Sequence, residues 1–132
     1  MPFEIINPAS LGAPSGWNNG LLAPAGGRLL FVAGQTARGA DGRIVGGGFV
    51  AQFERALENV LAVVRAAGGG PEHVGRMTVY VTDRAAYLDA LKPLGDVWRR
   101  HMGRHYPAMA LVEVAALVDD GAMVEIEATA VV

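Results

Sequence analysis

The stretch VAQFERALENVLAVVRAAGGGPEHVGRMTVYVT, residues 50–82, decides the fold of this chain. Its first half carries apolar residues at steps of three and four, namely Val50, Phe53, Leu57, Val60, Leu61 and Val64. This spacing predicts an amphipathic helix. Gly68 and Pro71 should end it, because glycine accepts the left-handed conformation of a helix C-cap and proline cannot continue the ladder. Residues 76–82 are rich in β-branched and aromatic side chains and predict a strand.

A second amphipathic helix is predicted directly after that strand, over residues 84–102. Asp83 stands where a helix N-cap is needed, since its short carboxylate can accept hydrogen bonds from the first free N–H groups. Pro93 should kink or split this helix, because proline lacks an N–H and its ring clashes with the preceding turn.

Further strands are predicted on both sides of these helices. Residues 29–33 and 108–116 are almost uninterrupted apolar runs, and residues 124–132 alternate between apolar and polar side chains. Residues 8–28, rich in proline and glycine, predict a loop region crossed by at most a short edge strand around Leu21. The order β-β-α-β-α-β-β predicts an α/β (α+β) fold: a single mixed β-sheet with two helices packed on one face.

Composition limits what such a protein can do. The 132 residues are expected to form one domain, residues 1–132, with a modest core. The chain has no cysteine, which excludes disulfides, thiolate nucleophiles and thiolate metal sites. No apolar run is long enough for a membrane span and the N-terminus has no leader pattern, so we expect a cytoplasmic protein without a membrane partner. The net charge of −2 and the scattered basic residues also argue against a nucleic-acid partner.

The sheet should have one face that its own helices cannot cover. Hydrophobic residues make up 52% of the chain, and residues 29–33 and 108–116 are apolar on both faces of their strands. Packing against other copies of the chain would bury that face, and ligand sites commonly form in the clefts between such copies. The composition does not fix the number of subunits.

Several segments resemble the RidA (YjgF) family in their order and spacing. They are LFVAGQ (residues 30–35), IVGG (44–47) with Gln52, ENV (58–60), AAG (66–68), residues 78–83, PA (107–108), VEV (112–114) and VEIEA (124–128). The resemblance implies a chorismate-mutase-like homotrimer with three sites at subunit interfaces. It also implies an enzyme that hydrolyses small imines and enamines, the substrates of 2-iminobutanoate/2-iminopropanoate deaminases, and releases ammonia without a cofactor or metal.

The resemblance assigns the site residues by position. Glu125 matches the glutamate that orients water, and Gly34 matches a glycine of the first strand that lines the pocket. Met109 stands where active members have an arginine that grips the substrate carboxylate, and Leu111 belongs to the same pocket wall. Trp17 takes the place of a loop tyrosine that closes the pocket. Since methionine offers no hydrogen-bond donor, the pocket is expected to take a less charged or more hydrophobic substrate.

Other interpretations of these residues stay open. Glu125 could face solvent on an alternating strand, and Trp17 could anchor its loop to the core instead of closing a pocket. Glu113, alone in an apolar strand, is expected to hold a hydrogen bond or ion pair at an interface. Arg38 or Arg104 could replace the missing arginine.

Metal and phosphate sites are not predicted. His101 and His105 are four residues apart and could share a helix face, but Gly103 should fray that helix and no third ligand is evident. The glycine triplets, at residues 46–48 and 68–70, lack the Lys-Ser/Thr ending of a phosphate-binding loop and are assigned to turns and caps.

Two functions are therefore carried forward. The first is a deaminase in which Glu125 manages water while Trp17 and Met109 shape an apolar wall. The second is a non-catalytic small-molecule binder or regulator with the same trimeric cleft. Ribonuclease activity or inhibition of translation, an older label in this family, fits this sequence poorly because nothing basic is organised to hold a phosphate chain.

Overall fold

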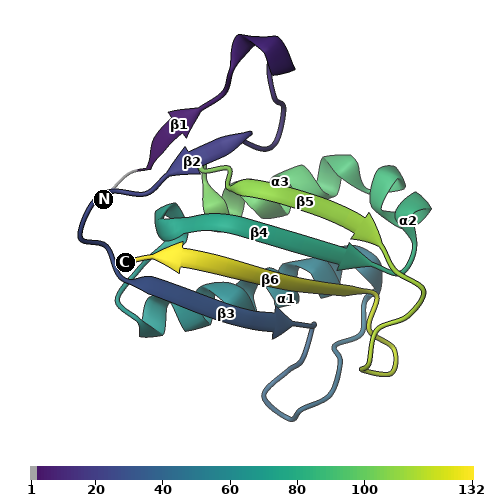
Figure 1. Cartoon of the computed structure of the whole chain (residues 1–132). Helices are drawn as coiled ribbons and strands as arrows, with labels where there is room; N and C mark the ends of the chain where they lie inside the picture. The colour runs from purple at the N-terminus through teal and green to yellow at the C-terminus, as the bar shows by residue number, and fades with distance from the viewer. Residues whose placement is uncertain (1–2) are drawn as a thin grey trace.

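A computed structural model describes residues 3–132 (Figure 1). Four strands form the main sheet: β3 (Leu29–Gln35), β4 (Val74–Val81), β5 (Ala108–Glu113) and β6 (Val124–Val131). The helices are α1 (Gly48–Ala66), α2 (Arg84–Asp89) and α3 (Leu91–Met102), with short 3-10 turns at Ala9–Leu11 and Pro71–His73. Two further strands, β1 (Glu4–Ile6) and β2 (Gly20–Leu22), pair only with each other.

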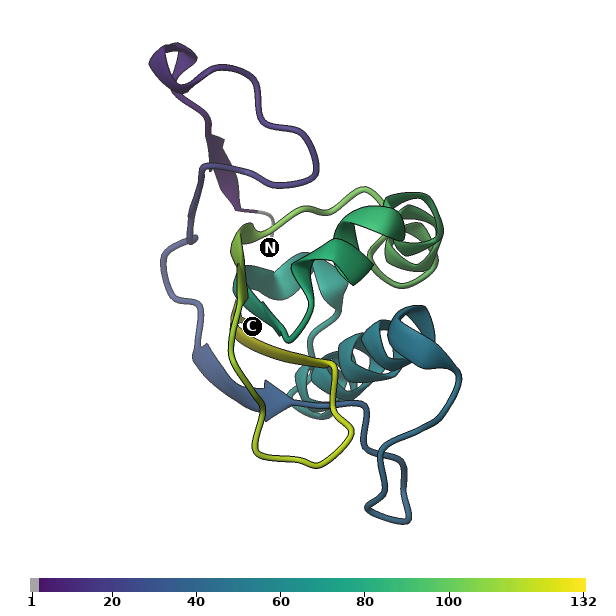
Figure 2. The same cartoon turned by 90° about the vertical axis from the view of Figure 1, so that its right-hand side faces the viewer.

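The main sheet has the order β3-β6-β4-β5 and is mixed. β4 and β5 run parallel, because α2 and α3 carry the chain across between them, whereas β6 is antiparallel to both β3 and β4. All three helices lie against one face of this sheet (Figure 2). The core forms there, between α1, α3 and the inward side chains of β4 and β6, among which Leu57, Met77 and Ile126 are fully buried. The predicted α+β class, with a mixed sheet and helices on one face, is confirmed.

The helix α1 ends as the glycines predicted. Gly68 has φ 89°, and its N–H donates to the carbonyl of Arg65 while the N–H of Gly69 donates to the carbonyl of Val64. These paired bonds satisfy the last carbonyls of the helix in the manner of a Schellman motif. At the next helix Asp83 caps α2 as expected, its Oδ1 accepting from the N–H groups of Ala85 and Ala86 at 2.9 and 3.2 Å.

The second predicted helix is split, as Pro93 indicated, but the break comes earlier. α2 ends at Asp89 and α3 begins at Leu91, with Ala90 between them at φ −108°. Pro93 therefore lies in the first turn of α3, where the missing N–H has no intrahelical acceptor to lose.

The N-terminal hairpin differs from the simplest expectation. The edge strand around Leu21 is present as β2, but it joins β1 in a separate two-stranded ribbon that projects beyond the β5 edge (Figures 1 and 2). β1 was not predicted, because three residues are too few to show a period. Asn18 fastens the ribbon to the sheet: its backbone N–H donates to the carbonyl of Pro107 at 3.1 Å and its side-chain amide to the carbonyl of Tyr106 at 2.7 Å.

Candidate functional site

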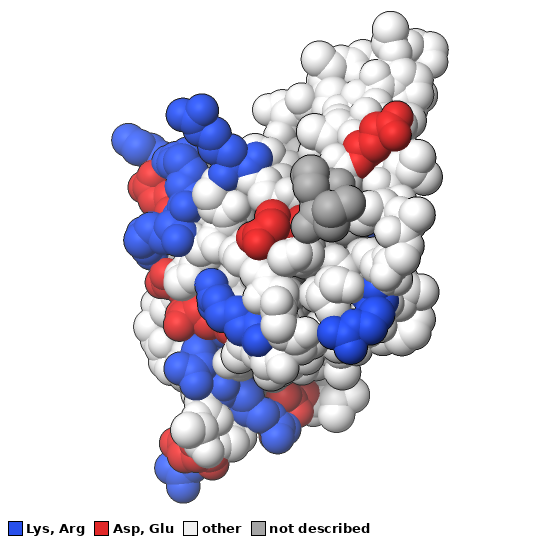
Figure 3. Space-filling view, turned by 90° about the vertical axis from the view of Figure 1, so that its left-hand side faces the viewer, with Lys and Arg blue, Asp and Glu red and all other residues white. Residues whose placement is uncertain are grey.

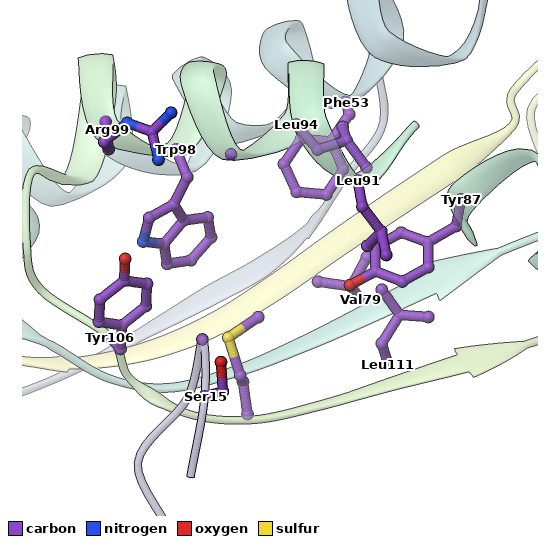
Figure 4. A pocket seen from close by; sticks show the side chains of 13 residues that line it. Ser15, Phe53, Val79, Tyr87, Leu91, Leu94, Trp98, Arg99, Tyr106 and Leu111 are labelled. Atoms are coloured by element: carbon purple, nitrogen blue, oxygen red, sulfur yellow. The ribbon is translucent and has the colours of Figure 1, made fainter. Parts of the chain in front are cut away.

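A cavity of about 240 Å³ lies between the parallel strand pair and helices α2 and α3. Its floor is formed by β4 and β5, its roof by α3, and one rim by the loop before β2. Figure 4 shows aromatic and aliphatic side chains converging on this space from both layers. The lining residues that matter for its chemistry are Met109, Leu111, Tyr87, Trp98, Arg99 and Tyr106.

The strand register sends Met109 and Leu111 into this cavity. Met109 pairs with Met77 and Leu111 with Val79 in the parallel ladder, and Met77 and Val79 are fully buried under the helices. Because side chains alternate along a strand, Met109 and Leu111 point to the same helix-covered face. Both are half-buried and pack against the core.

Aromatic rings and one guanidinium line the helical side of the cavity. Trp98 and Tyr106 stack with ring centroids 6.0 Å apart and planes within 6°, and the indole N–H of Trp98 donates to the carbonyl of His105 at 3.1 Å. Arg99 lies one residue beyond Trp98 on α3 and pairs with Asp96 on the preceding turn. A buried aromatic wall beside a cation can hold a flat ligand that carries a negative group.

Glu125 and Gly34 lie on the opposite, open face of the sheet. Glu125 alternates with the buried Val124 and Ile126 on β6, so its carboxylate points away from the helices. It rests against β3 at Gly34, where the ladder register shifts. A Cβ at Gly34 would lie only 2.5 Å from Oε2 of Glu125. Glycine is thus what lets the carboxylate lie against the strand.

A second carboxylate on this face is tied to a tyrosine. The hydroxyl of Tyr80 donates to Glu127 at 2.9 Å, and this hydrogen bond to an anion raises the pKa of Tyr80 above its ordinary value. Glu125 pairs with Tyr80 in the strand register but has no such partner among the hydrogen bonds of residues 3–132. Of the two carboxylates, Glu125 is the one open to a ligand or water.

One copy of the chain therefore does not bring all the expected site residues together. Met109 and Leu111 line the cavity under α3, whereas Gly34 and Glu125 lie on the other face, with β4 between β5 and β6. The expected site residues of one chain thus form two separate groups.

Trp17 lies on the surface of its loop. It is 43% exposed, its indole N–H donates to Asn19 at 3.2 Å, and it lines none of the cavity described above. Its neighbours Ser15 and Gly16 form the rim instead, and Asn18 is the residue that anchors the loop. The anchor interpretation of Trp17 is wrong for this reason, and the lid interpretation remains a prediction.

Neither arginine proposed as a replacement reaches Met109 within the chain. Arg38 pairs with Asp119 at 2.9 Å, and Arg104 borders a separate hollow beside the hairpin. The lining of the Met109 cavity contains Arg99 instead. The sequence analysis did not single out Arg99, although its step of four from Gly95 places the two residues on one face of α3.

The remaining polar candidates have structural partners. Glu113 accepts a hydrogen bond from the backbone N–H of Arg84 at 2.8 Å, at the start of α2 in the same chain, and its expected role at an interface stays a prediction. His101 contacts Glu54 at 2.7 Å while His105 contacts the carbonyl of Val74 at 2.7 Å, so the two histidines do not share a ligand.

A carboxylate–histidine cluster does exist elsewhere, between α1 and α3. Ligand atoms of Glu54, Glu58 and His101 lie within 4.8 Å of one another. Arg100 also pairs with Glu54 at 2.8 Å. The hydrogen bonds from His101 and then Arg100 lower the pKa of Glu54, so the cluster works as an ion-pair network between the helices.

The surface charge follows the layers of the fold. In Figure 3 the basic side chains lie mainly over the helices with acidic ones among them, while the projecting hairpin is almost uncharged. On the face that Figure 3 shows, this mixture forms no continuous basic track of the kind that a phosphate chain needs. In the part of the chain that the structure describes, no helix is long and apolar enough to cross a membrane.

The fold places the chain in a class of α+β proteins in which helices cover one face of a mixed sheet and the other face stays open. The chain belongs to the Endoribonuclease L-PSP family, whose model matches residues 10–132, and within it to the RidA/YjgF proteins. It is 34% identical over 105 residues to a goat (Capra hircus) protein named 2-iminobutanoate/2-iminopropanoate deaminase, covering 79% of this chain and 73% of that one. It is 39% identical over 106 residues to protein DfrA of Myxococcus xanthus, covering 80% and 77%.

Solved structures agree with this assignment. YyfB of the Rid family from Yersinia pestis superposes with a TM-score of 0.86 at 32% identity, covering 100% of each chain. TdcF of E. coli, solved with bound serine, superposes with a TM-score of 0.66 at 31% identity, covering 92% of this chain and 91% of that one. The predicted family is confirmed.

Proposed function

We propose that this chain is a hydrolytic deaminase of small imines and enamines, acting as a homotrimer with its sites between subunits. The observation that carries the proposal is the position of Glu125. Its carboxylate has no hydrogen-bond partner in residues 3–132 and lies against Gly34 on the uncovered face of the sheet. Relatives named 2-iminobutanoate/2-iminopropanoate deaminase support the reaction type.

In this proposal, each of the two groups of expected site residues needs a neighbouring copy of the chain to complete a site. The open face exposes large apolar side chains, with Phe31 at 76%, Leu29 at 64% and Val112 at 43% exposure. Covering such side chains is favourable at roughly 25 cal/mol per Å² of apolar surface. In a closed ring, Glu125 and Gly34 of one subunit would face the Met109 cavity of the next, which gives each subunit boundary one complete site.

The chemistry requires only water and one carboxylate. Glu125 would take a proton from water as the water oxygen bonds to the imine carbon and the C=N electron pair moves to nitrogen, which is protonated. The protonated Glu125 then gives its proton to the carbinolamine nitrogen, and the hydroxyl proton returns to Glu125 as the carbonyl forms, the C–N bond breaks and ammonia leaves. An enamine enters the same path after protonation at carbon has converted it to the imine.

Met109 defines the substrate preference in this proposal. A thioether side chain fills irregular apolar space and donates no hydrogen bond, so this wall contacts the apolar part of a substrate and offers no donor to a carboxylate. The predicted preference is for substrates with side chains more hydrophobic than the one-carbon or two-carbon side chains of 2-iminopropanoate and 2-iminobutanoate.

The activity test uses imines that a second enzyme generates in the assay mixture. An amino-acid dehydratase or an L-amino-acid oxidase supplies the imine, and ammonia release is followed with and without the purified chain. We expect acceleration that is lost in Glu125→Gln and kept in Glu127→Gln, a matched change on the same strand face. No acceleration with either class of imine would refute the deaminase.

The alternative is a non-catalytic small-molecule-binding or regulatory trimer, and Met109 is the observation that favours it. Met109→Arg separates the two, because a chain that has lost only the clamp should gain activity on the small imine from a dehydratase. If Met109→Arg binds small 2-oxo acids but still releases no ammonia, the alternative holds.

A further inference from the structure

We propose that the cavity under α3 binds small carboxylates with a flat or branched apolar group, and that Arg99 holds the carboxylate from the helical wall. This inference rests on the proposed function and names its substrate class: imines of amino acids with aromatic or branched side chains. Met109, on the opposite wall, would then contact the apolar group.

Arg99 is the arginine in the cavity lining. Figure 4 shows its guanidinium at the α3 side of the cavity, beside Trp98 and on the same side as Tyr106. Its ion pair with Asp96 uses only Nη2, and both side chains are more than half exposed, at 63% and 53%, so that pair is weak. The other N–H donors of the fork remain for a ligand carboxylate.

Gly95 leaves space for a ligand in the cavity lining beside Arg99. A glycine inside a helix is unfavourable compared with alanine, and here no left-handed backbone or close backbone approach requires it. A Cβ at this position would meet only the guanidinium nitrogens of Arg99, at 3.6 and 3.9 Å. What the glycine provides is open space in the cavity lining, on the face of α3 that carries Arg99.

The size and shape of the cavity favour a ring or branched group. Roughly 150 Å³ is enough for one benzene ring in an apolar cavity. The cavity here is about 240 Å³, which leaves space for a ring with a short acid group. The stacked Trp98 and Tyr106 present flat apolar surface on the helical side, and Leu111 and Val79 close the floor. Charge and shape together fit an aryl or branched 2-oxo acid or its imine.

The test measures binding without turnover, by calorimetry on the full-length assembled protein. The probes are phenylpyruvate, pyruvate, and phenylacetone, which keeps the ring and ketone but lacks the carboxylate. We expect phenylpyruvate to bind at least about tenfold more tightly than either of the others, since it alone has both the ring and the acid group.

Variants of α3 then assign the contacts. Arg99→Gln should lower phenylpyruvate affinity about tenfold and leave phenylacetone unchanged, while Arg100→Gln, the neighbouring arginine that faces Glu54, is the matched control. Gly95→Leu should abolish phenylpyruvate binding while its unfolding temperature stays at or above that of the parent, because leucine is the better helix former.

Two results would overturn the inference: equal affinity for pyruvate and phenylpyruvate, or an Arg99→Gln variant that binds phenylpyruvate as the parent does. The outcome is separable from the proposed function. A chain that binds phenylpyruvate through Arg99 yet releases no ammonia keeps this inference and loses the deaminase, and a chain that deaminates small imines without this binding does the reverse.

Discussion

Replacing Gly34 by alanine tests the role of Glu125 without touching the glutamate. The added Cβ would lie 2.5 Å from Oε2, 2.9 Å from Cδ and 3.1 Å from Cγ of Glu125. Ordinary contacts between such atoms are about 3.5 Å, so the carboxylate must retreat by about 1 Å. The glutamate side chain is flexible and can make this move, because a displaced rotamer costs only about 0.5–1.5 kcal/mol.

Stability and activity should therefore respond differently to Gly34→Ala. Alanine in a strand is better than glycine by roughly 0.5–1 kcal/mol, which offsets the rotamer cost and leaves the free energy of unfolding within about 1 kcal/mol of the parent. Misplacing a catalytic group by about 1 Å can lower the rate about 100-fold. We expect that loss in ammonia release from a substrate that the parent deaminates.

The matched control is Gly46→Ala, because a Cβ there meets nothing within 4 Å and the backbone is not left-handed. It should keep both stability and activity. Full activity in a folded Gly34→Ala protein would refute the reasoning, since it would show that the position of Glu125 against β3 is irrelevant to the reaction.

Three further predictions concern the fold and its assembly. Leu57→Ala removes a fully buried side chain between α1 and the sheet and should lower the free energy of unfolding by about 2–5 kcal/mol in urea titrations; a loss below about 1 kcal/mol would contradict the described core. Phe31→Asp places a charge on the open face, where Phe31 is 76% exposed, and sedimentation should show folded, smaller species in place of the parent assembly. Hydrogen bonds from Thr36 and then Arg38 lower the pKa of Asp119, so its stabilising effect is present at neutral pH and is lost as the pH falls through that lowered pKa. Asp119→Asn should therefore unfold at a lower temperature than the parent at pH 7, with the difference vanishing once the pH has fallen below that lowered pKa; a difference independent of pH would contradict the pairing.

The periodic spacing of apolar residues was sufficient to predict most of the helices and strands. The steps of three and four in residues 50–64 predicted α1, and the alternation in residues 124–132 predicted β6, because burial on one side of an element imposes its geometric repeat on the sequence. The caps were also local, since Asp83 and Gly68 act on backbone groups two or three residues away. The β1–β2 ribbon was not fully foreseen, because it is held by Asn18 against the distant residues Tyr106 and Pro107.

The sequence by itself predicted the four strands of the main sheet, the helical segments and their apolar faces, and its resemblance to the family predicted Gly34, Met109 and Glu125 as site residues. Only the tertiary structure decided that Met109 and Glu125 lie on opposite faces of one sheet, and that Arg99 shares a cavity with Met109. The physical reason is that alternation fixes faces within a strand but not between strands. How β5 registers beside β4, and which turn of α3 lies over it, depends on packing between residues that are distant in the chain.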